Sequence, residues 1–335
     1  MRSEGDPAGR RSVPRGSLRA QWAAAVGLTL VLGMLGADVR ADAPAGAPAP
    51  RSQPAFAGLH VMPGKPGYAQ TNLGYVHYWE LGNGPALLLL HGGPMFGVQF
   101  AKVMPLLARA GYRVIAADLP GFGLSSLPDH AASGEEYADA MAALLDHLGV
   151  KQANVAGMLT GGVVTLAFAT RHPQRTRCVV LMSTPVYSAE DLQEKRAEPA
   201  RDTRIWSDGR HLGEGWRQRQ AARPMPNASP EAQQWLMIGG LLAGDPETWW
   251  PAGQGGEFVS RSYDTQQAVI DLRAPTLLLT LADGSMKKHA QRMLALRPDF
   301  RHVALEASQA LVPYDFPEPW ASAVADFLQK DCRPR

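Results

Sequence analysis

One stretch decides the fold: Asn154-Val155-Ala156-Gly157-Met158-Leu159-Thr160-Gly161-Gly162. A mostly apolar run at residues 153–156 enters a Gly-x-x-x-Gly turn, and a helical pattern at residues 163–170 leaves it. Strand, tight turn and helix are the layout of a turn that presents a nucleophile between its glycines. Glycines are needed because a larger side chain would block the strained backbone and the close approach of helix to strand. The residue between them is Leu159, which has no nucleophilic atom.

Strands and helices are predicted to alternate on both sides of this turn. Besides residues 153–156, apolar runs predict strands at residues 75–81, 86–90, 112–117, 178–183, 275–280 and 302–306. Helices are predicted at residues 100–110, 133–148, 163–170 and 317–329. The second of these helices opens with a capping box, in which Ser133 and Glu136 satisfy each other's backbone N–H groups. This alternation predicts an α/β fold with a mainly parallel sheet covered by helices on both faces.

Three motifs stand at the ends of predicted strands. They are His91-Gly92-Gly93-Pro94, Asp118-x-Pro120-Gly121-x-Gly123-x-Ser125 and Gly157-x-x-x-Gly161-Gly162. With these motifs in this order, the chain resembles the α/β-hydrolase family over about residues 68–329. Residues 186–265 interrupt the alternation and contain five of the eight tryptophans. The resemblance implies that this insertion forms a helical cap over the site.

The resemblance also implies where a Ser-His-Asp triad would stand. Nucleophile, acid and histidine are expected in that order, and their positions here hold Leu159, Gly284 and Ala310. Asp283 precedes the acid position by one residue, but its pairing with a glycine is typical of a turn. His302 begins its strand, and at about 3.3 Å per residue it should lie roughly 10 Å or more from the site. Loss of both nucleophile and histidine predicts that charge-relay chemistry is absent.

The oxyanion hole is expected to survive, because it needs only backbone N–H groups. The pocket residues predicted on this basis are Gly92, Gly93, Leu159 and Thr160, with the N–H groups supplied by Gly93 and Thr160. His91 is interpreted as a support for its own loop. In the cap, His211 is a weak candidate for a base or a ligand contact, but its surroundings favour a solvent-facing helix start.

The chain has two cysteines, to which we assign structural roles. Cys178 and Cys332 could pair in an exported protein, but one buried thiol and one tail thiol is the favoured interpretation. No Cys-x-x-Cys, His-Glu-x-x-His or His/Asp cluster suggests a metal site, and no cofactor is expected.

The five tryptophans of the cap are Trp206, Trp216, Trp235, Trp249 and Trp250. We expect most of them to pack the cap's own core, and one or two to reach the pocket.

The N-terminal region has the basic, apolar and small-residue order of a signal peptide, predicted to span residues 1–43. Cleavage is expected before Asp42, or after Ala43 as second choice. The protein is therefore expected to be periplasmic or secreted. An uncleaved inner-membrane anchor is the lesser alternative, because the apolar run at residues 22–37 falls short of the roughly 20 residues of a span. Residues 44–67 are rich in Pro and Ala and predict a linker, and residues 68–335 form the hydrolase-like domain.

The 33 basic and 31 acidic residues nearly balance, so no charge pattern favours nucleic acid. The hypothesis favoured by the sequence is an exported, non-catalytic binder of a small apolar molecule. Two alternatives stay open. One is an enzyme with a relocated or non-serine constellation that uses Asp283 or His211, and the other is a protein-interaction module that uses the cap surface. Membrane contact is expected only if the N-terminal apolar segment is retained.

Overall fold

The computed structural model describes residues 62–197, 207–209, 213, 216–217, 221, 225–243, 263–281, 286–307 and 311–332. Several predictions concern residues outside these ranges. They are the signal peptide, most of the linker, and the site candidates His211, Asp283, Gly284 and Ala310.

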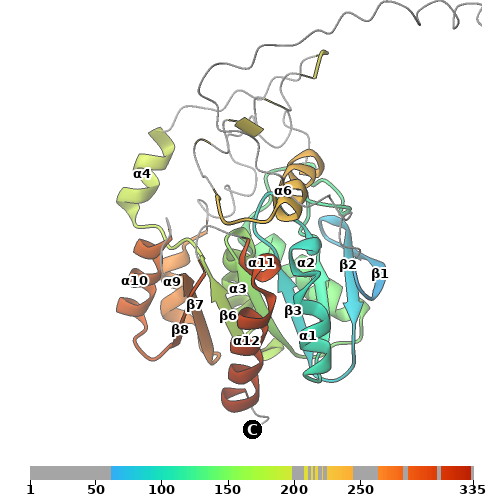
Figure 1. Ribbon diagram of the computed structural model, residues 1–335. Helices are drawn as coiled ribbons and strands as arrows, with labels where there is room; N and C mark the ends of the chain where they lie inside the picture. Colours follow the sequence, from blue (N-terminus) through green and yellow to red (C-terminus); the bar gives the residue numbers. More distant parts are fainter. Residues whose placement is uncertain are drawn as a thin grey trace, which may run out of the picture. The chain divides into compact units, whose positions relative to one another are not determined.

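An eight-stranded sheet runs through the described residues in the order β1-β2-β4-β3-β5-β6-β7-β8 (Figure 1). Its strands are β1 Lys65–Thr71, β2 Gly74–Leu81, β3 Ala86–Leu90, β4 Arg113–Ala117, β5 Ala153–Met158, β6 Thr176–Met182, β7 Thr276–Leu281 and β8 Arg301–Leu305. The strands from β3 onward pair in parallel, whereas β1 with β2 and β2 with β4 pair antiparallel. Strand β3 is buried along its whole length, as a central parallel strand requires.

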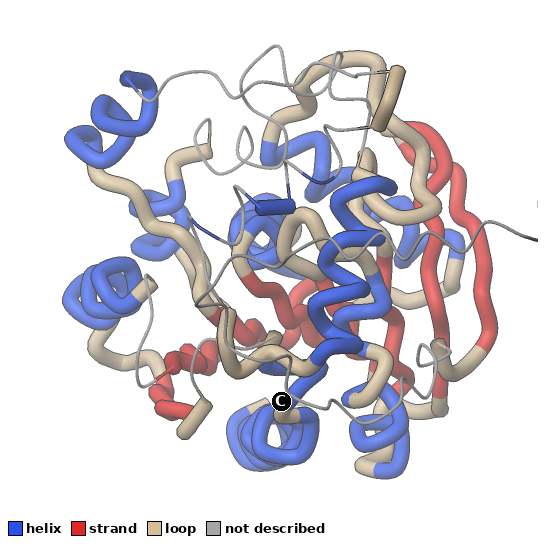
Figure 2. Tube along the Cα trace, turned by 45° about the horizontal axis from the view of Figure 1, so that its top comes forward, coloured by secondary structure: helices blue, strands red, loops and turns tan. Residues whose placement is uncertain are grey.

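Helices cover both faces of the sheet (Figure 2). The described helices are η1 Gly97–Phe100, α1 Val103–Arg109, α2 Gly134–His147, α3 Thr160–Arg171, η2 Pro173–Arg175, α4 Ala189–Ala197, α6 Pro230–Leu242, α9 Thr265–Asp271, α10 Lys287–Leu296, α11 Val312–Asp315 and α12 Pro317–Asp331. Helices α1 and α12 pack on one face, and α2, α3, α9 and α10 on the other. The predicted mainly parallel α/β architecture is confirmed.

Successive side chains of β3 point to opposite faces of the sheet, so they divide between two parts of the core. Leu87 and Leu89 pack in the cluster of α1 and α12, whereas Leu88 and Leu90 pack in the cluster of α2 and α3. Each buried leucine stabilises the fold by about 1.5–3 kcal/mol relative to an exposed one. The predicted capping box at the start of α2 is confirmed, because the Ser133 hydroxyl accepts the Glu136 N–H and the Glu136 carboxylate accepts the Ser133 N–H.

The predicted linker is too long at its C-terminal end. Strand β1 begins at Lys65, so the last three residues of the predicted linker belong to the sheet. Among the described strands, β1 lies at the edge and pairs with β2 alone, and Ala69 is its one fully buried residue. An edge strand with so little buried apolar surface has no alternating pattern strong enough to distinguish it from a Pro- and Gly-rich linker.

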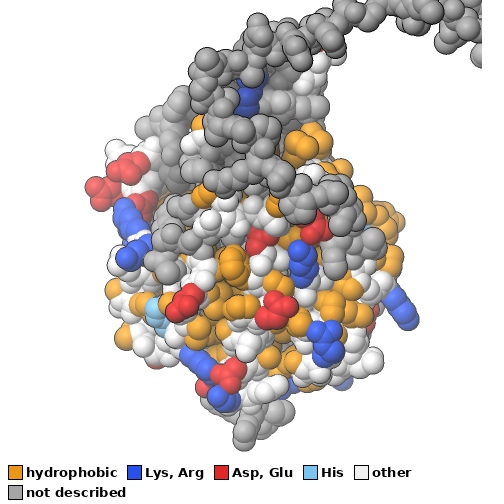
Figure 3. All heavy atoms as spheres, viewed as in Figure 1, with side chains coloured by type: hydrophobic (Ala, Val, Ile, Leu, Met, Phe, Trp, Pro, Cys, Tyr) orange, Lys and Arg blue, Asp and Glu red, His pale blue; other side chains and the backbone are white. Residues whose placement is uncertain are grey.

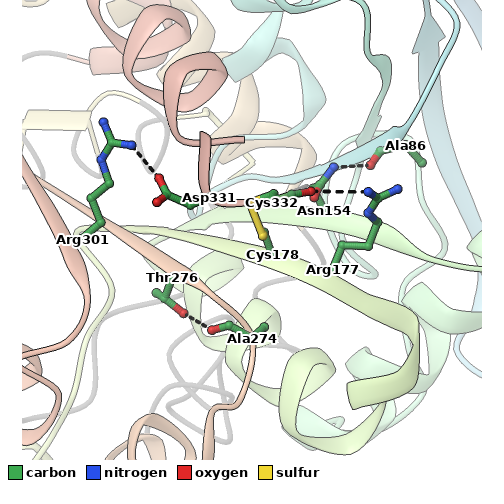
Figure 4. Close-up of a disulfide and its surroundings, with 9 residues drawn as sticks. All are labelled: Ala86, Asn154, Arg177, Cys178, Ala274, Thr276, Arg301, Asp331 and Cys332. Atoms are coloured by element: carbon green, nitrogen blue, oxygen red, sulfur yellow. Dashed lines mark hydrogen bonds and ion pairs between the residues drawn. A yellow bond between two sulfur atoms is a disulfide. The ribbon is translucent and has the colours of Figure 1, made fainter. Parts of the chain in front are cut away.

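The two cysteines form a disulfide, so the favoured interpretation of two free thiols is wrong. Cys178 lies in β6 and Cys332 follows α12, with their Cα atoms 6.0 Å apart (Figure 4). This separation is typical of disulfides. The two cysteines are separated by 154 residues in the sequence. Only the packing of α12 against the sheet brings them together, and no local sequence pattern reports that packing.

Candidate functional site

The central turn joins β5 to α3 at the carboxyl edge of the sheet. Leu159 stands between them with φ 49° and ψ −120°, in a region that residues with a side chain rarely adopt. The glycines around it have no room for a Cβ atom. At Gly157 a Cβ would overlap the carbonyl oxygen of Gly161, and at Gly161 it would overlap that of Leu90. The predicted need for glycine therefore has a specific cause, which is contact between backbones.

The His91–Pro94 loop lies directly against this turn. The Gly161 N–H donates to the His91 carbonyl oxygen at 2.9 Å. A Cβ on Gly92 would lie 2.9 Å from Leu159 Cβ and Cδ1, and one on Gly93 would lie 3.5 Å from Thr160 Oγ1. The structure thus brings together all four residues that the sequence predicted to line the pocket.

Internal hydrogen bonds hold the His91–Pro94 loop. The Gly92 N–H donates to Gln99 Oε1 at 2.9 Å, and the Leu119 N–H donates to His91 Nε2 at 2.9 Å. Burial lowers the pKa of His91 to about 4, so its imidazole is neutral near pH 7. A neutral ring that accepts a backbone N–H supports the loop, as expected from the sequence.

The second motif is organised by Asp118, which is fully buried after β4. Its carboxylate accepts the N–H groups of Gly97 at 2.7 Å and Leu124 at 2.9 Å, and it contacts His77 Nδ1 at 2.9 Å. A Cβ at Gly123 would overlap the same carboxylate. Asp118 therefore ties the loop after β3 to the loop after β4 and fixes both beside the pocket residues.

These residues can bind an oxygen atom beside an apolar surface. Thr160 is the first residue of α3 and already has an interaction partner of its own. For the Gly93 N–H, the described part of the chain contains no recorded acceptor. Leu159 is partly buried, and the Phe122 ring lies 3.4 Å from a Cβ placed on Gly93. Backbone N–H groups of this kind stabilise a carbonyl oxygen or an oxyanion.

The described residues supply no triad around Leu159. The acid and histidine positions, Gly284 and Ala310, lie outside the described ranges, as do Asp283 and His211. His302 is described and lies in β8, where it is exposed and its Nε2 is 2.8 Å from Thr280 Oγ1. It is a surface residue.

Sequence reasoning missed Ser183. This residue follows β6 directly, just as Leu159 follows β5, and the last residues of the two strands are paired. Ser183 has φ 47°, and within the described ranges it and Leu159 are the two non-glycine residues with positive φ. Such a conformation costs of order 1–3 kcal/mol. The register of β5 against β6 would have indicated the proximity, but the sequence alone does not provide that register.

The cap insertion contributes α6, which packs on the pocket loop. A Cβ on Gly239 would lie 2.6 Å from the Pro94 carbonyl oxygen. The Trp235 ring packs edge to face on Phe96, with ring centroids 5.7 Å apart. Trp216 packs in the same cluster, whereas the other three cap tryptophans lie outside the described residues. Trp216 and Trp235 pack in a cluster that the cap shares with the sheet domain, which agrees with the expectation that one or two cap tryptophans reach beyond the cap's own core.

Polar contacts hold α6 to the segment after β8. The Trp235 Nε1–H donates to the Tyr314 hydroxyl at 3.1 Å, and the Ser229 hydroxyl donates to Asp315 Oδ1 at 2.6 Å. Burial raises the pKa of Tyr314, so its phenol stays protonated. The loop that carries Gly93, the cap helix and the segment near the expected histidine position therefore form one connected unit.

The described residues offer little further chemistry outside this site. A surface groove of about 380 Å³ is lined by Asp146, Gly149, Val150, Lys151 and Arg175. These residues precede β5 and β6 or lie at the end of α2, at the edge of the sheet opposite Leu159, so we assign the groove no role at this site. The described side chains include no group of three or more His, Cys, Asp or Glu that could hold a metal ion. None of the described helices is long and apolar enough to span a membrane.

Comparison with known proteins agrees with this architecture. A family model described as the alpha/beta hydrolase fold matches residues 85–199. "Bifunctional epoxide hydrolase 2" from Rattus norvegicus is 38% identical over 126 residues, which are 36% of this chain and 22% of that protein. "Haloalkane dehalogenase 2" from Mycobacterium tuberculosis is 33% identical over 126 residues, covering 37% of this chain and 44% of that protein. The chain thus spans less than half the length of either relative.

Solved structures show the same fold over most of the chain. A thermophilic esterase from Thermogutta terrifontis, in a malate-bound structure, is 22% identical with a TM-score of 0.62. The match covers 80% of this chain and 100% of that one. At this level of identity the likeness establishes the fold alone.

Proposed function

Because this chain belongs to the α/β-hydrolase fold family, we propose that it is an exported, non-catalytic binder of a small apolar molecule that carries a carbonyl group. The observation that supports this most is Leu159 itself. It occupies the strained position between Gly157 and Gly161, with φ 49°, where the fold presents an attacking group. A leucine at that position cannot form a covalent bond to a substrate, but it offers an apolar surface.

The ligand chemistry is inferred from the groups around Leu159. The Gly93 N–H offers a hydrogen-bond donor to one oxygen atom, and Leu159 and Phe122 offer apolar contact. The relatives are named as an epoxide hydrolase and a dehalogenase, and both reactions need a group that attacks carbon. A site that offers a hydrogen-bond donor but has no attacking group at position 159 favours binding of a ligand without its turnover.

Binding and turnover can be measured separately with phenylacetone and p-nitrophenyl acetate. We expect wild-type protein to bind phenylacetone, to hydrolyse p-nitrophenyl acetate no faster than heat-treated protein, and to resist labelling by fluorophosphonate. Leu159→Trp should fill the pocket and abolish phenylacetone binding. Leu241→Trp is the matched control, because Leu241 is 55% exposed on α6 and should leave binding unchanged. Saturable hydrolysis that is lost in Leu159→Trp would contradict the proposal and favour the enzyme alternative.

Restoring a hydroxyl at the turn should not restore catalysis. Leu159→Ser alone is expected to give no measurable ester turnover, because a serine without a base is a weak nucleophile and triad members act as a unit. The triple variant that adds Gly284→Asp and Ala310→His tests whether the turn and the donors can still support hydrolysis. Turnover by Leu159→Ser alone would reveal a base that already lies beside position 159.

Export is part of the proposal and has two supports. One is the signal-peptide order of residues 1–43, and the other is the disulfide between Cys178 and Cys332, since disulfides persist mainly in oxidising compartments. N-terminal sequencing of protein from the native cell envelope should read from Asp42. Recovery of the chain from the cytoplasm with Met1 intact would refute this part.

A second candidate function is favoured by the outer side of α6. Hydrophobic side chains gather over this helix in Figure 3, and its exposed ones include Met237, Leu241 and Leu242. Exposed apolar side chains close together are typical of interaction surfaces. Leu241→Asp separates the two functions, because it should disrupt a protein complex formed through α6 and leave phenylacetone binding unchanged.

A further inference from the structure

The turn between β2 and β3 combines an asparagine with a following glycine. It spans Gly82 to Pro85, between the last residue of β2 and the first of β3, with Asn83 and Gly84 at its centre. Strand β3 runs parallel to β5, so this turn lies at the edge of the sheet opposite Leu159. The chain has four asparagines, and Asn83 is the one that a glycine follows. Neither the proposed binding site nor the exposed side of α6 involves this turn.

Two groups that can react with each other are accessible at this turn. Asn83 and Gly84 are both exposed. Among the residues that the structure describes, neither the Asn83 side-chain amide nor the Gly84 N–H has a recorded hydrogen-bond partner. An exposed N–H group without a protein acceptor bonds to water, where hydroxide ion can remove its proton. Because glycine has no Cβ atom, nothing on Gly84 hinders the approach of its nitrogen to the neighbouring amide carbon.

The backbone on either side of Asn83 is closely packed. Gly82 has φ 83° and Gly84 has φ 106°, conformations that favour glycine. A Cβ at Gly82 would lie 2.5 Å from the Tyr112 carbonyl oxygen, and one at Gly84 would overlap that of Gly111. The turn therefore rests on the loop between α1 and β4. An additional atom in the backbone of this turn would displace one of these contacts.

We propose that Asn83 is a modification site at which the asparagine converts to isoaspartate without an enzyme. The deprotonated Gly84 nitrogen forms a bond to Cγ of Asn83, and the bond from Cγ to Nδ2 breaks. The departing nitrogen takes a proton from water and leaves as ammonia. Water then opens the five-membered imide at either of its two carbonyl carbons. Opening at the backbone carbonyl leaves the chain running through Cγ, which adds one carbon to the backbone and one negative charge to the turn.

The other three asparagines lack this combination of exposure and a following glycine. Asn72 donates from Nδ2 to the Glu136 carbonyl oxygen at 3.1 Å and is not followed by glycine. Asn154 is buried in β5. Asn227 is exposed but precedes Ala228, whose Cβ hinders attack by the backbone nitrogen. Asn227 is therefore the matched control within the same chain, since it shares the exposure and differs in the residue that follows.

Peptide mapping of the folded protein by mass spectrometry tests the proposal. During incubation in mildly alkaline buffer, the peptide that contains Asn83 should gain the mass difference between a hydroxyl and an amino group, and Asn227 should stay unchanged. The modified peptide should accept a methyl group from an isoaspartate methyltransferase added as a reagent. Asn83→Gln should abolish the change at this turn, because its amide carbon lies one carbon farther along the side chain from the Gly84 nitrogen.

Urea unfolding measures what the conversion does to the fold. Protein that contains isoaspartate should unfold at lower urea than fresh protein, because the added backbone carbon displaces the contacts of Gly82 or Gly84. Asn83→Asp carries the new charge without the added carbon, and it should unfold near the wild-type midpoint. If the folded protein keeps Asn83 intact while the urea-unfolded chain converts, the turn blocks the reaction and the proposal is refuted. Equal conversion at Asn83 and Asn227 would also refute it, since the following glycine would then make no difference.

Discussion

Gly161→Ala is expected to destabilise the folded protein by more than about 3 kcal/mol, an exceptional effect for a single methyl group. A Cβ at this position would overlap the Leu90 carbonyl oxygen and lie 2.5 Å from that of His91. Both contacts are with backbone atoms of a central strand and of the pocket loop, and neither can rotate away as a side chain would. Relief would require α3 to move off β3, which would also break the hydrogen bond from the Gly161 N–H to His91.

Urea unfolding of purified variants measures this effect. Gly240→Ala is the matched control, because Gly240 lies inside α6, and a Cβ there meets no atom within 4 Å. Alanine in an exposed helix interior is favoured over glycine, so this control should be neutral or stabilising by up to about 1 kcal/mol. Equal unfolding midpoints for Gly161→Ala and wild type would mean that β3 and α3 are farther apart than the structure shows.

Removing the disulfide by Cys178→Ala with Cys332→Ala should lower the free energy of unfolding by about 3–5 kcal/mol. The bond closes a loop of 154 residues, and cross-links over long loops restrict the unfolded chain most. The loss should appear as earlier urea unfolding of the double variant, and as the same shift when wild-type protein is fully reduced. Titration of the unfolded wild-type chain should detect no free thiol until reductant is added.

A second contact between α12 and the sheet, formed by ion pairs, serves as the control for this measurement. Arg301 in β8 forms ion pairs with Asp326 and Asp331 of α12 near the protein surface. Exposed ion pairs contribute little, so Arg301→Ala should shift the unfolding midpoint far less than loss of the disulfide. Free thiols in the oxidised wild-type protein, or a double variant as stable as wild type, would show that the cysteines are not joined.

The proposed function and the stability of the turn depend on different atoms of the same segment. Gly157, Gly161 and Gly162 let α3 approach β5, β3 and Thr184, respectively, through their lack of a side chain, whereas the proposed chemistry of the site is set by the side chain of Leu159. The turn can therefore keep its geometry whatever side chain stands at position 159. The proposed binder function would need no change in that geometry.

The sequence by itself determined the fold class and the residue at the centre of the turn, which is a leucine. Burial of continuous apolar runs requires a parallel sheet, and glycines around position 159 require a tight turn, whatever the rest of the chain does. Both signals can be read from the residues of one short segment, because hydrophobic periodicity and the positions of glycines are properties of neighbouring residues. For the same reason the capping box of α2 could be predicted at its correct position.

Only the tertiary structure decided which distant residues meet. The disulfide joins residues 154 positions apart, and Ser183 reaches Leu159 through the register between β5 and β6. The contact of Trp235 with Phe96 and Tyr314 depends on how α6 packs over the pocket loop. Strand register and helix packing arise from the summed burial of many side chains across the whole domain, so no single segment of the sequence encodes them.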